Sequence, residues 1–123
     1  MTEQKKILVV DDDPDLCDLY RMALEPEGFA VLSAGSAAEG QKRAVADKPD
    51  LVILDIMMEE AQSGITLAHW LAREYPQVPV MLLSSIIDAG AQVFDIGSVP
   101  AALCVNKPLT PQQLIASVKS LLG

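Results

Sequence analysis

The stretch Lys6-Ile-Leu-Val-Val-Asp-Asp-Asp-Pro-Asp15 decides how this chain folds. Four apolar residues at positions 7–10 follow one another without alternating polar residues, and three aspartates at positions 11–13 come directly after them. A strand that is buried on both faces of a parallel sheet has such a continuous apolar run. The stretch therefore predicts a central strand whose carboxyl end opens at an acidic site.

A second stretch, Leu51-Val-Ile-Leu-Asp55, repeats this pattern with four apolar residues and one carboxylate. Parallel strands present their carboxyl ends at one edge of the sheet, where open α/β sheets bind their ligands. We therefore expect Asp11, Asp12 and Asp55 to lie close together. Neighbouring carboxylates need a positively charged partner, so the pattern indicates a cation site.

Length and composition indicate one α/β domain over residues 1–123. The chain is long enough to bury a core, and 50% of its residues are hydrophobic. No apolar run approaches the roughly 18 residues of a membrane span, and no apolar segment of an export signal follows the amino terminus. We therefore expect a cytoplasmic protein that does not bind membranes.

The charge distribution disfavours polyanions as partners. The formal net charge is −8, and five of the acidic residues lie between Asp11 and Asp18. Such a field repels DNA, RNA and anionic lipid at long range. A divalent cation is the expected charged partner, and direct binding of nucleic acid is not expected.

Four residues with reactive or aromatic side chains have a structural interpretation. Cys17 and Cys104 form no Cys-x-x-Cys motif, so we expect buried free thiols and no disulfide. His69 lies far along the sequence from the aspartates and is expected at the surface or boundary of a helix. Trp70, beside it, is expected to pack.

The first half of the chain continues with helix and strand signals. Asp12 or Asp13 can cap a helix that has Pro14 in its first turn and ends at Gly28. Residues 29–34 are expected as a strand, and Ser36-Ala-Ala-Glu39 is a capping box for a helix that runs to about residue 47. The first helix should pack through an apolar stripe made of Leu16, Leu19, Tyr20, Ala23 and Leu24.

The second half repeats the alternation. Residues 56–64 are expected to be irregular, and a helix should cover residues 65–74. A strand is expected at 80–84 and ends at Ser84, a short helix is expected near 88–96, and a strand expected at 101–106 precedes Lys107. Thr110-Pro-Gln-Gln113 is a capping box that opens the last helix. The pattern is (βα)5, which predicts a doubly wound, five-stranded parallel sheet.

In this arrangement the strand ends supply Asp11, Asp12, Asp55, Ser84 and Lys107. These groups suit phosphoryl transfer to a carboxylate. Mg²⁺ prefers oxygen ligands, and one carboxylate can act as the nucleophile. A hydroxyl and an ammonium can each bind an oxygen of the transferring group.

Four motifs together resemble a response-regulator receiver domain of two-component signalling, over essentially the whole chain. They are Ile7-Leu-Val-Val-Asp-Asp-Asp-Pro, Pro49-Asp-Leu-Val-Ile-Leu-Asp55-Ile-Met-Met, Pro79-Val-Met-Leu-Leu-Ser84 and Lys107-Pro-Leu. The resemblance implies a flavodoxin-like strand order of 2-1-3-4-5. It also implies that a sensor histidine kinase or a small phosphodonor phosphorylates Asp55, and that the chain promotes only its own phosphorylation and dephosphorylation.

The resemblance further implies roles for the other site residues. Mg²⁺ would be held by Asp12, Asp55 and the main-chain carbonyl of Met57, with Asp11 acting mainly through water. Lys107 would pair with the phosphoryl group, and its bond to Pro108 would be cis. Ser84 would move inward on phosphorylation. The face formed by residues 88–96, the strand at 101–106 and the last helix would then change its affinity for a downstream protein effector, an output domain or a second copy of the chain.

The chain departs from the family pattern at several positions. Glu59 stands where the family usually has Pro, in a loop that is one residue longer than usual, and Cys104 replaces the usual aromatic residue. Switching must therefore use groups other than that aromatic side chain. Met57 and Ile86 occupy positions that are often polar, and two bulky apolar side chains there should hinder an in-line water. We therefore predict a long-lived phosphorylated form.

Two alternative functions remain open at this point. The first is an interaction module of the same fold that no longer depends on phosphorylation, which the residues at 59 and 104 suggest. The second is a small Mg²⁺-dependent phosphatase acting through an aspartyl phosphate, although Met57 stands where that chemistry usually has a second Asp. Either a stand-alone regulator or part of a longer regulator is compatible with the sequence.

Overall fold

The structure is a computed structural model that describes residues 4–55, 61–84, 102–106 and 110–122, without the side chains at 61–63, 84, 104 and 106. A parallel sheet of five strands, in the order β2-β1-β3-β4-β5, forms its centre. This order confirms the predicted fold class. The strands are β1 Lys6–Val10, β2 Ala30–Ala34, β3 Leu51–Asp55, β4 Val80–Ser84 and β5 Leu103–Asn106.

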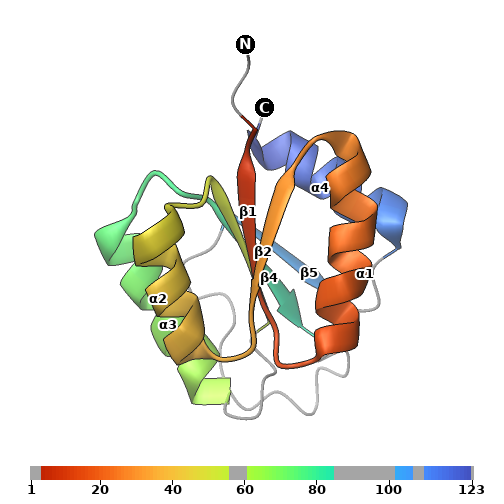
Figure 1. Cartoon of the computed structure of the whole chain (residues 1–123). Coiled ribbons are helices and arrows are strands. Elements are labelled where there is room, and N and C mark those ends of the chain that lie inside the picture. The colour runs from red at the N-terminus through yellow and green to blue at the C-terminus, as the bar shows by residue number, and fades with distance from the viewer. Residues whose placement is uncertain (1–3, 56–60, 85–101, 107–109, 123) are drawn as a thin grey trace.

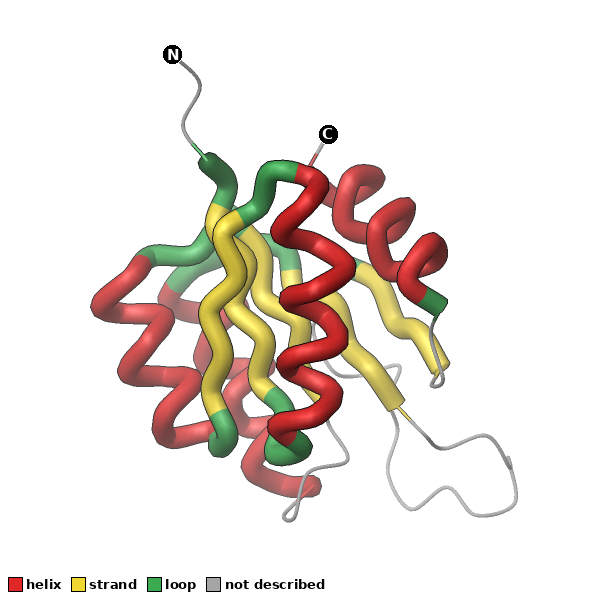
Figure 2. Tube along the Cα trace, turned by 45° about the vertical axis from the view of Figure 1, so that its right-hand side comes forward, coloured by secondary structure: helices red, strands yellow, loops and turns green. Residues whose placement is uncertain are grey.

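Helices cover both faces of the sheet (Figure 1, Figure 2). The helices α2 and α3 pack on one face, and α1 and α4 pack on the other. The predicted helix near residues 88–96 lies outside the described residues. The label α4 therefore belongs to the helix that follows β5. The helices are α1 Pro14–Leu24, α2 Ala37–Asp47, α3 Ala61–Glu74 and α4 Pro111–Leu122, with a short 3-10 helix, Glu25–Glu27, after α1.

The continuous apolar run of β1 is explained by burial on both sides. Leu8 and Val10 belong to the core under α2 and α3, whereas Ile7 and Val9 belong to the core under α1 and α4. Each of these side chains is at most 1% exposed. The same alternation divides β3, because successive residues of a strand point to opposite faces. The buried strands β1 and β3 therefore determine the positions of Asp11, which follows β1, and of Asp55, which ends β3.

The helix starts follow the predicted caps. The Asp13 side chain accepts a hydrogen bond from the Asp15 backbone N–H at 3.0 Å and caps α1. Ser36 Oγ accepts from the Glu39 backbone N–H at 3.1 Å at the start of α2. At the start of α4, Thr110 and Gln113 form a reciprocal capping box with distances of 2.9 and 3.1 Å.

The structure corrects four sequence predictions. Helix α3 begins at Ala61 and not at Ile65, because Gly64 is buried inside the helix and does not end a loop. Leu19 was predicted to pack but is 44% exposed, because the buried side of α1 is formed by Cys17, Tyr20 and Leu24. Strand β5 begins at residue 103 and not 101, and β2 begins at 30 and not 29.

None of the helices within the described ranges is long and apolar enough to cross a membrane.

Candidate functional site

Three carboxylates meet at the carboxyl edge of the sheet. One carboxylate oxygen from each of Asp11, Asp12 and Asp55 lies within 4.8 Å of the other two. Asp11 is 1% exposed and Asp55 is 3% exposed, whereas Asp12 is exposed to solvent. The predicted convergence of these residues is confirmed.

Hydrogen bonds fix Asp11 from three directions. Its backbone N–H donates to the Ala34 carbonyl at 3.0 Å, which extends the pairing of β1 with β2 by one residue. Its carboxylate Oδ1 accepts from the Asp13 backbone N–H at 3.0 Å. Its carbonyl accepts a hydrogen bond from the Cys17 thiol at 3.5 Å. The loop that carries the acidic pair is therefore held by the strand before it and the helix after it.

Asp13, the third aspartate of the run, has a different role from its two neighbours. Its side chain caps α1, and it is absent from the group of three converging carboxylates. The distinction follows from the chain direction, because Pro14 begins the helix and places Asp13 at the N-cap position. The acidic run thus divides into two site residues and one helix cap.

The contact of Cys17 with the loop that carries Asp11 was not predicted from the sequence. The sequence indicated a buried free thiol, and the structure confirms a free cysteine that is 6% exposed. Burial, together with the nearby carboxylate of Asp11, raises the pKa of the thiol to about 11. Its hydrogen bond to the Asp11 carbonyl spans a loop and a helical turn, and such a contact has no sequence signal.

Asp55 ends β3 and lies beside the end of β4. It is paired in register with Leu83, so Ser84 is one residue further along the adjacent strand. Ser84 is in turn paired with Asn106 of β5, the residue directly before Lys107. The backbone therefore brings the ends of β3, β4 and β5 to one edge. The Ser84 side chain and all of Met57 and Lys107 lie outside the described residues.

The three carboxylates suit a hard divalent cation. Mg²⁺ binds oxygen ligands at about 2.0–2.1 Å in an octahedron, so two opposite ligands are roughly 4.2 Å apart. Adjacent ligands of the same octahedron are roughly 2.9 Å apart. Oxygens that lie within 4.8 Å of one another are therefore close enough to converge on one ion by side-chain rotation. Two buried carboxylates with an exposed third leave a solvent side for water or phosphate oxygens. Cys17 is not among the residues that converge here, and a soft thiol is a poor ligand for Mg²⁺.

Comparison with known proteins identifies the family of this chain. The family model of the response regulator receiver domain matches residues 7–119. The alkaline phosphatase synthesis transcriptional regulatory protein PhoP of Bacillus subtilis is 32% identical over 96% of this chain and 48% of its own length. The DNA-binding response regulator MtrA of Mycolicibacterium smegmatis is 37% identical over 97% of this chain and 51% of its own length. The chain thus spans about half the length of these relatives.

Solved structures of other response regulators have the same fold as this chain. A CheY-like response regulator receiver domain protein from Methanospirillum hungatei superposes with a TM-score of 0.84 at 26% identity, covering 98% of this chain and 94% of its own. The chemotaxis response regulator CheY4 of Vibrio cholerae has a TM-score of 0.85 at 21% identity, covering 98% and 100%, which shows the shared fold.

Proposed function

Because this chain belongs to the response regulator receiver domain family, we propose that Asp55 accepts a phosphoryl group from a sensor histidine kinase or a small phosphodonor. The convergence of Asp11, Asp12 and Asp55 carries this proposal. Mg²⁺ would be held by Asp12, Asp55 and the Met57 carbonyl, with Asp11 acting mainly through water. When bound, the ion would offset the negative charge that gathers around the transferring group.

The proposed transfer is a displacement at phosphorus. A carboxylate oxygen of Asp55 forms the new O–P bond while the P–N bond of the phosphohistidine breaks. The electron pair of that bond leaves with the imidazole, and the product on the chain is an acyl phosphate. The buried position of Asp55 at a strand end holds the nucleophile in one place, and positioning of this kind is a large part of catalysis in phosphoryl transfer.

Two further side chains complete the proposal. Lys107 would pair with the phosphoryl oxygens, and Ser84 would bind one of them and thereby move inward. The backbone order supports this assignment, since the ends of β4 and β5 lie next to the end of β3. The inward movement of Ser84 would shift the conformation of the face that includes β5 and α4. We place the contact with an effector, an output domain or a second copy of the chain on this face.

Incubation with acetyl phosphate and Mg²⁺, followed by intact-mass measurement, separates the candidate functions. We expect one stable phosphoryl group per chain, none after Asp55→Asn, and an unchanged result after Asp15→Asn. Asp15 is the matched control, because it is an exposed aspartate of the first turn of α1 outside the carboxylate group. An interaction module would take no label, and a phosphatase would turn over a phosphoester such as p-nitrophenyl phosphate continuously.

A further inference from the structure

A small apolar cavity lies at the opposite end of the sheet from the three carboxylates. Its volume is about 120 Å³. Pro49 and Val78 lie just before the starts of β3 and β4, so the cavity is at the amino edge of the sheet. Asp55 is the last of the five residues of β3, so it lies roughly 13 Å beyond the first residue of the strand at the usual rise. The lining residues are Ala44, Lys48, Pro49, Leu71, Tyr75 and Val78.

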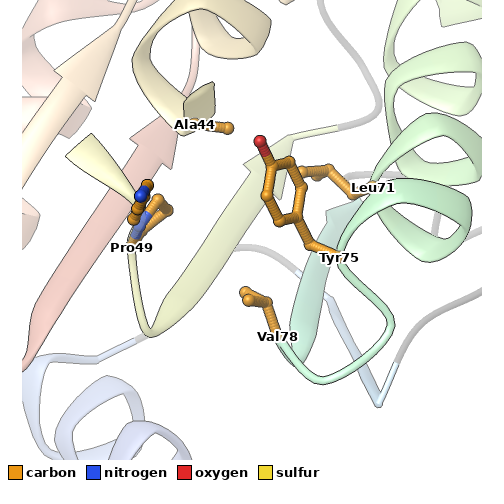
Figure 3. Close-up of a pocket in the computed structure, with 6 residues that line it drawn as sticks. Ala44, Pro49, Leu71, Tyr75 and Val78 are labelled. Carbon is orange, nitrogen blue, oxygen red and sulfur yellow. The ribbon is translucent and has the colours of Figure 1, made fainter. Parts of the chain in front are cut away.

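Two rings lie on opposite sides of this cavity. Figure 3 shows Pro49 on one side and Tyr75 on the other, with Ala44 and Val78 closing the two remaining sides. Pro49 is buried. An apolar cavity with a tyrosine ring in its wall suits an aromatic ring, because aromatic pairs add favourable contacts to apolar burial.

The Tyr75 wall is held in place before any ligand arrives. Its backbone N–H donates to the Leu71 carbonyl at 2.8 Å, and its carbonyl accepts from the Val78 N–H at 3.0 Å. Its ring makes a T-shaped contact with Trp70, with a centroid distance of 5.6 Å and an interplanar angle of 68°. A preformed wall costs little ordering entropy on binding.

The volume limits the ligand to one ring. A dry cavity of about 150 Å³ lined by apolar side chains binds benzene. The present cavity is slightly smaller and is open at one side, so a single six-membered aromatic ring can enter while its substituent remains at the mouth. A drug-sized molecule needs a pocket of at least about 300 Å³ and is excluded.

Lys48 is the one charged residue among those that line the cavity. This residue ends α2 in a left-handed conformation with φ of 50°, and it is exposed. None of the ion pairs formed among the described residues includes Lys48. The exposed Lys48 side chain is therefore available to pair with an anion.

The acidic groups near the cavity already have partners. Asp47 pairs with Arg43 at 3.7 Å, and Glu74 pairs with the adjacent Arg73 at 3.2 Å. Asp50 accepts a hydrogen bond from the Lys6 backbone N–H at 2.8 Å. These contacts reduce the repulsion that the net negative charge of the chain would otherwise exert on an anionic ligand at Lys48.

We propose that this cavity binds a small aromatic carboxylate, with the ring between Pro49 and Tyr75 and the carboxylate at Lys48. The site is separate from the proposed phosphorylation site, so its occupancy is testable in the unphosphorylated chain. A ligand of this size with one exposed ion pair should bind with a dissociation constant on the order of 1 mM. The ion pair with Lys48 should raise the affinity for this ligand roughly two- to fivefold.

Titration with benzoate, followed by two-dimensional NMR, tests the proposal in the whole chain. Trp70 is the single tryptophan, so its indole N–H gives one resonance that reports on the neighbouring Tyr75 ring. We expect saturable shifts of that resonance and of the backbone amides of Lys48, Tyr75 and Val78. The absence of saturable shifts would overturn the proposal.

Three variants assign the binding to this cavity. Val78→Phe should fill the space and Tyr75→Ala should remove one wall, and each should weaken benzoate binding at least tenfold while the spectrum stays that of a folded chain. Lys48→Asn removes the charge with a residue that tolerates the left-handed conformation. It should weaken benzoate roughly two- to fivefold and leave benzyl alcohol unchanged. Benzoate binding that persists in both Val78→Phe and Tyr75→Ala would place the ligand elsewhere.

Discussion

Asp11 directly follows β1 and Asp55 ends the adjacent strand β3, and their carboxylates each have an oxygen within 4.8 Å of the other although the residues are far apart in the sequence. Both residues are almost completely buried. Two like charges at this separation repel each other, and burial strengthens the repulsion because the surroundings screen it poorly. A divalent cation removes this repulsion, which gives the proposed cation requirement its physical origin.

Mg²⁺ should therefore stabilise the folded chain. A ligand that binds only the folded state at 100 times its dissociation constant contributes about 2.7 kcal/mol to the free energy of unfolding. For a chain of this length we expect the melting temperature to rise by roughly 5–10 °C. Thermal melts with Mg²⁺ and with EDTA measure the shift. It should nearly vanish in Asp12→Asn and survive in Asp15→Asn, and an equal shift in both variants would contradict the assignment.

Gly40 lets α2 approach β1 closely. A Cβ atom placed there would lie 2.9 Å from Val10 Cγ2 and 3.2 Å from Leu67 Cδ2. Overpacking of this kind costs about 1–3 kcal/mol, and the better helix propensity of Ala offsets up to about 1 kcal/mol.

We therefore expect Gly40→Ala to lower the free energy of unfolding by about 1–2 kcal/mol in urea titrations. Gly35→Ala is the control, because its Cβ would meet only the flexible Glu39 side chain at 3.8 Å. This variant should stay within about 0.5 kcal/mol of the parent chain. A Gly40→Ala chain as stable as the control would show that Val10 and Leu67 move aside freely.

The thiol of Cys17 should make stability depend on pH in the alkaline range. Its pKa in the folded chain is about 11, above the value of 9.0 for an unperturbed thiol. Between these two values the folded state keeps the proton that the unfolded state releases, so stability falls as pH rises. Below about pH 9 both states are protonated and the effect is absent.

The comparison with Cys17→Ala isolates this contribution. The difference in unfolding free energy between the parent and Cys17→Ala should favour the parent at pH 8, where the thiol donates to the Asp11 carbonyl. It should decrease by about 1 kcal/mol per pH unit between pH 9 and 11. A difference that stays constant over this range would show that the buried thiol does not titrate as described.

The phosphorylated chain should lose its phosphoryl group slowly. Met57 and Ile86 lie outside the described residues, and the expectation rests on two bulky apolar residues that follow Asp55 and Ser84 by two positions in the sequence. Replacing both, as Met57→Asn with Ile86→Glu, should admit an in-line water and shorten the lifetime about tenfold, a change of roughly 1.4 kcal/mol in the barrier. Loss of label followed by mass spectrometry gives the rate. Equal lifetimes in the two chains would refute the idea.

Much of the fold could be predicted because local signals agree with the tertiary structure. The apolar runs of β1 and β3 are buried on both faces, and the caps at Asp13, Ser36 and Thr110 form as their sequences indicate. The start of α3 could not be predicted. Glycine has a poor helix propensity and usually weakens a helix. Gly64 nevertheless lies inside α3, because packing at this buried position outweighs that propensity.

The site was predictable only in part, for a physical reason. Strand ends are fixed by the order of the sheet, so the meeting of Asp11, Asp12 and Asp55 follows from the pattern. The division of the acidic run into site residues and the Asp13 cap depends on where the helix begins. The thiol contact of Cys17 with the Asp11 carbonyl depends on side-chain packing, which no local pattern encodes.

A crystal structure of the chain with Mn²⁺ in place of Mg²⁺ tests the central claim most directly, since anomalous scattering locates the ion without ambiguity. The account predicts one ion coordinated by carboxylate oxygens of Asp12 and Asp55 at about 2.0–2.2 Å, with the Lys107 ammonium facing Asp55. An ion that does not contact Asp55, or a Lys107 side chain directed away from it, would contradict the account.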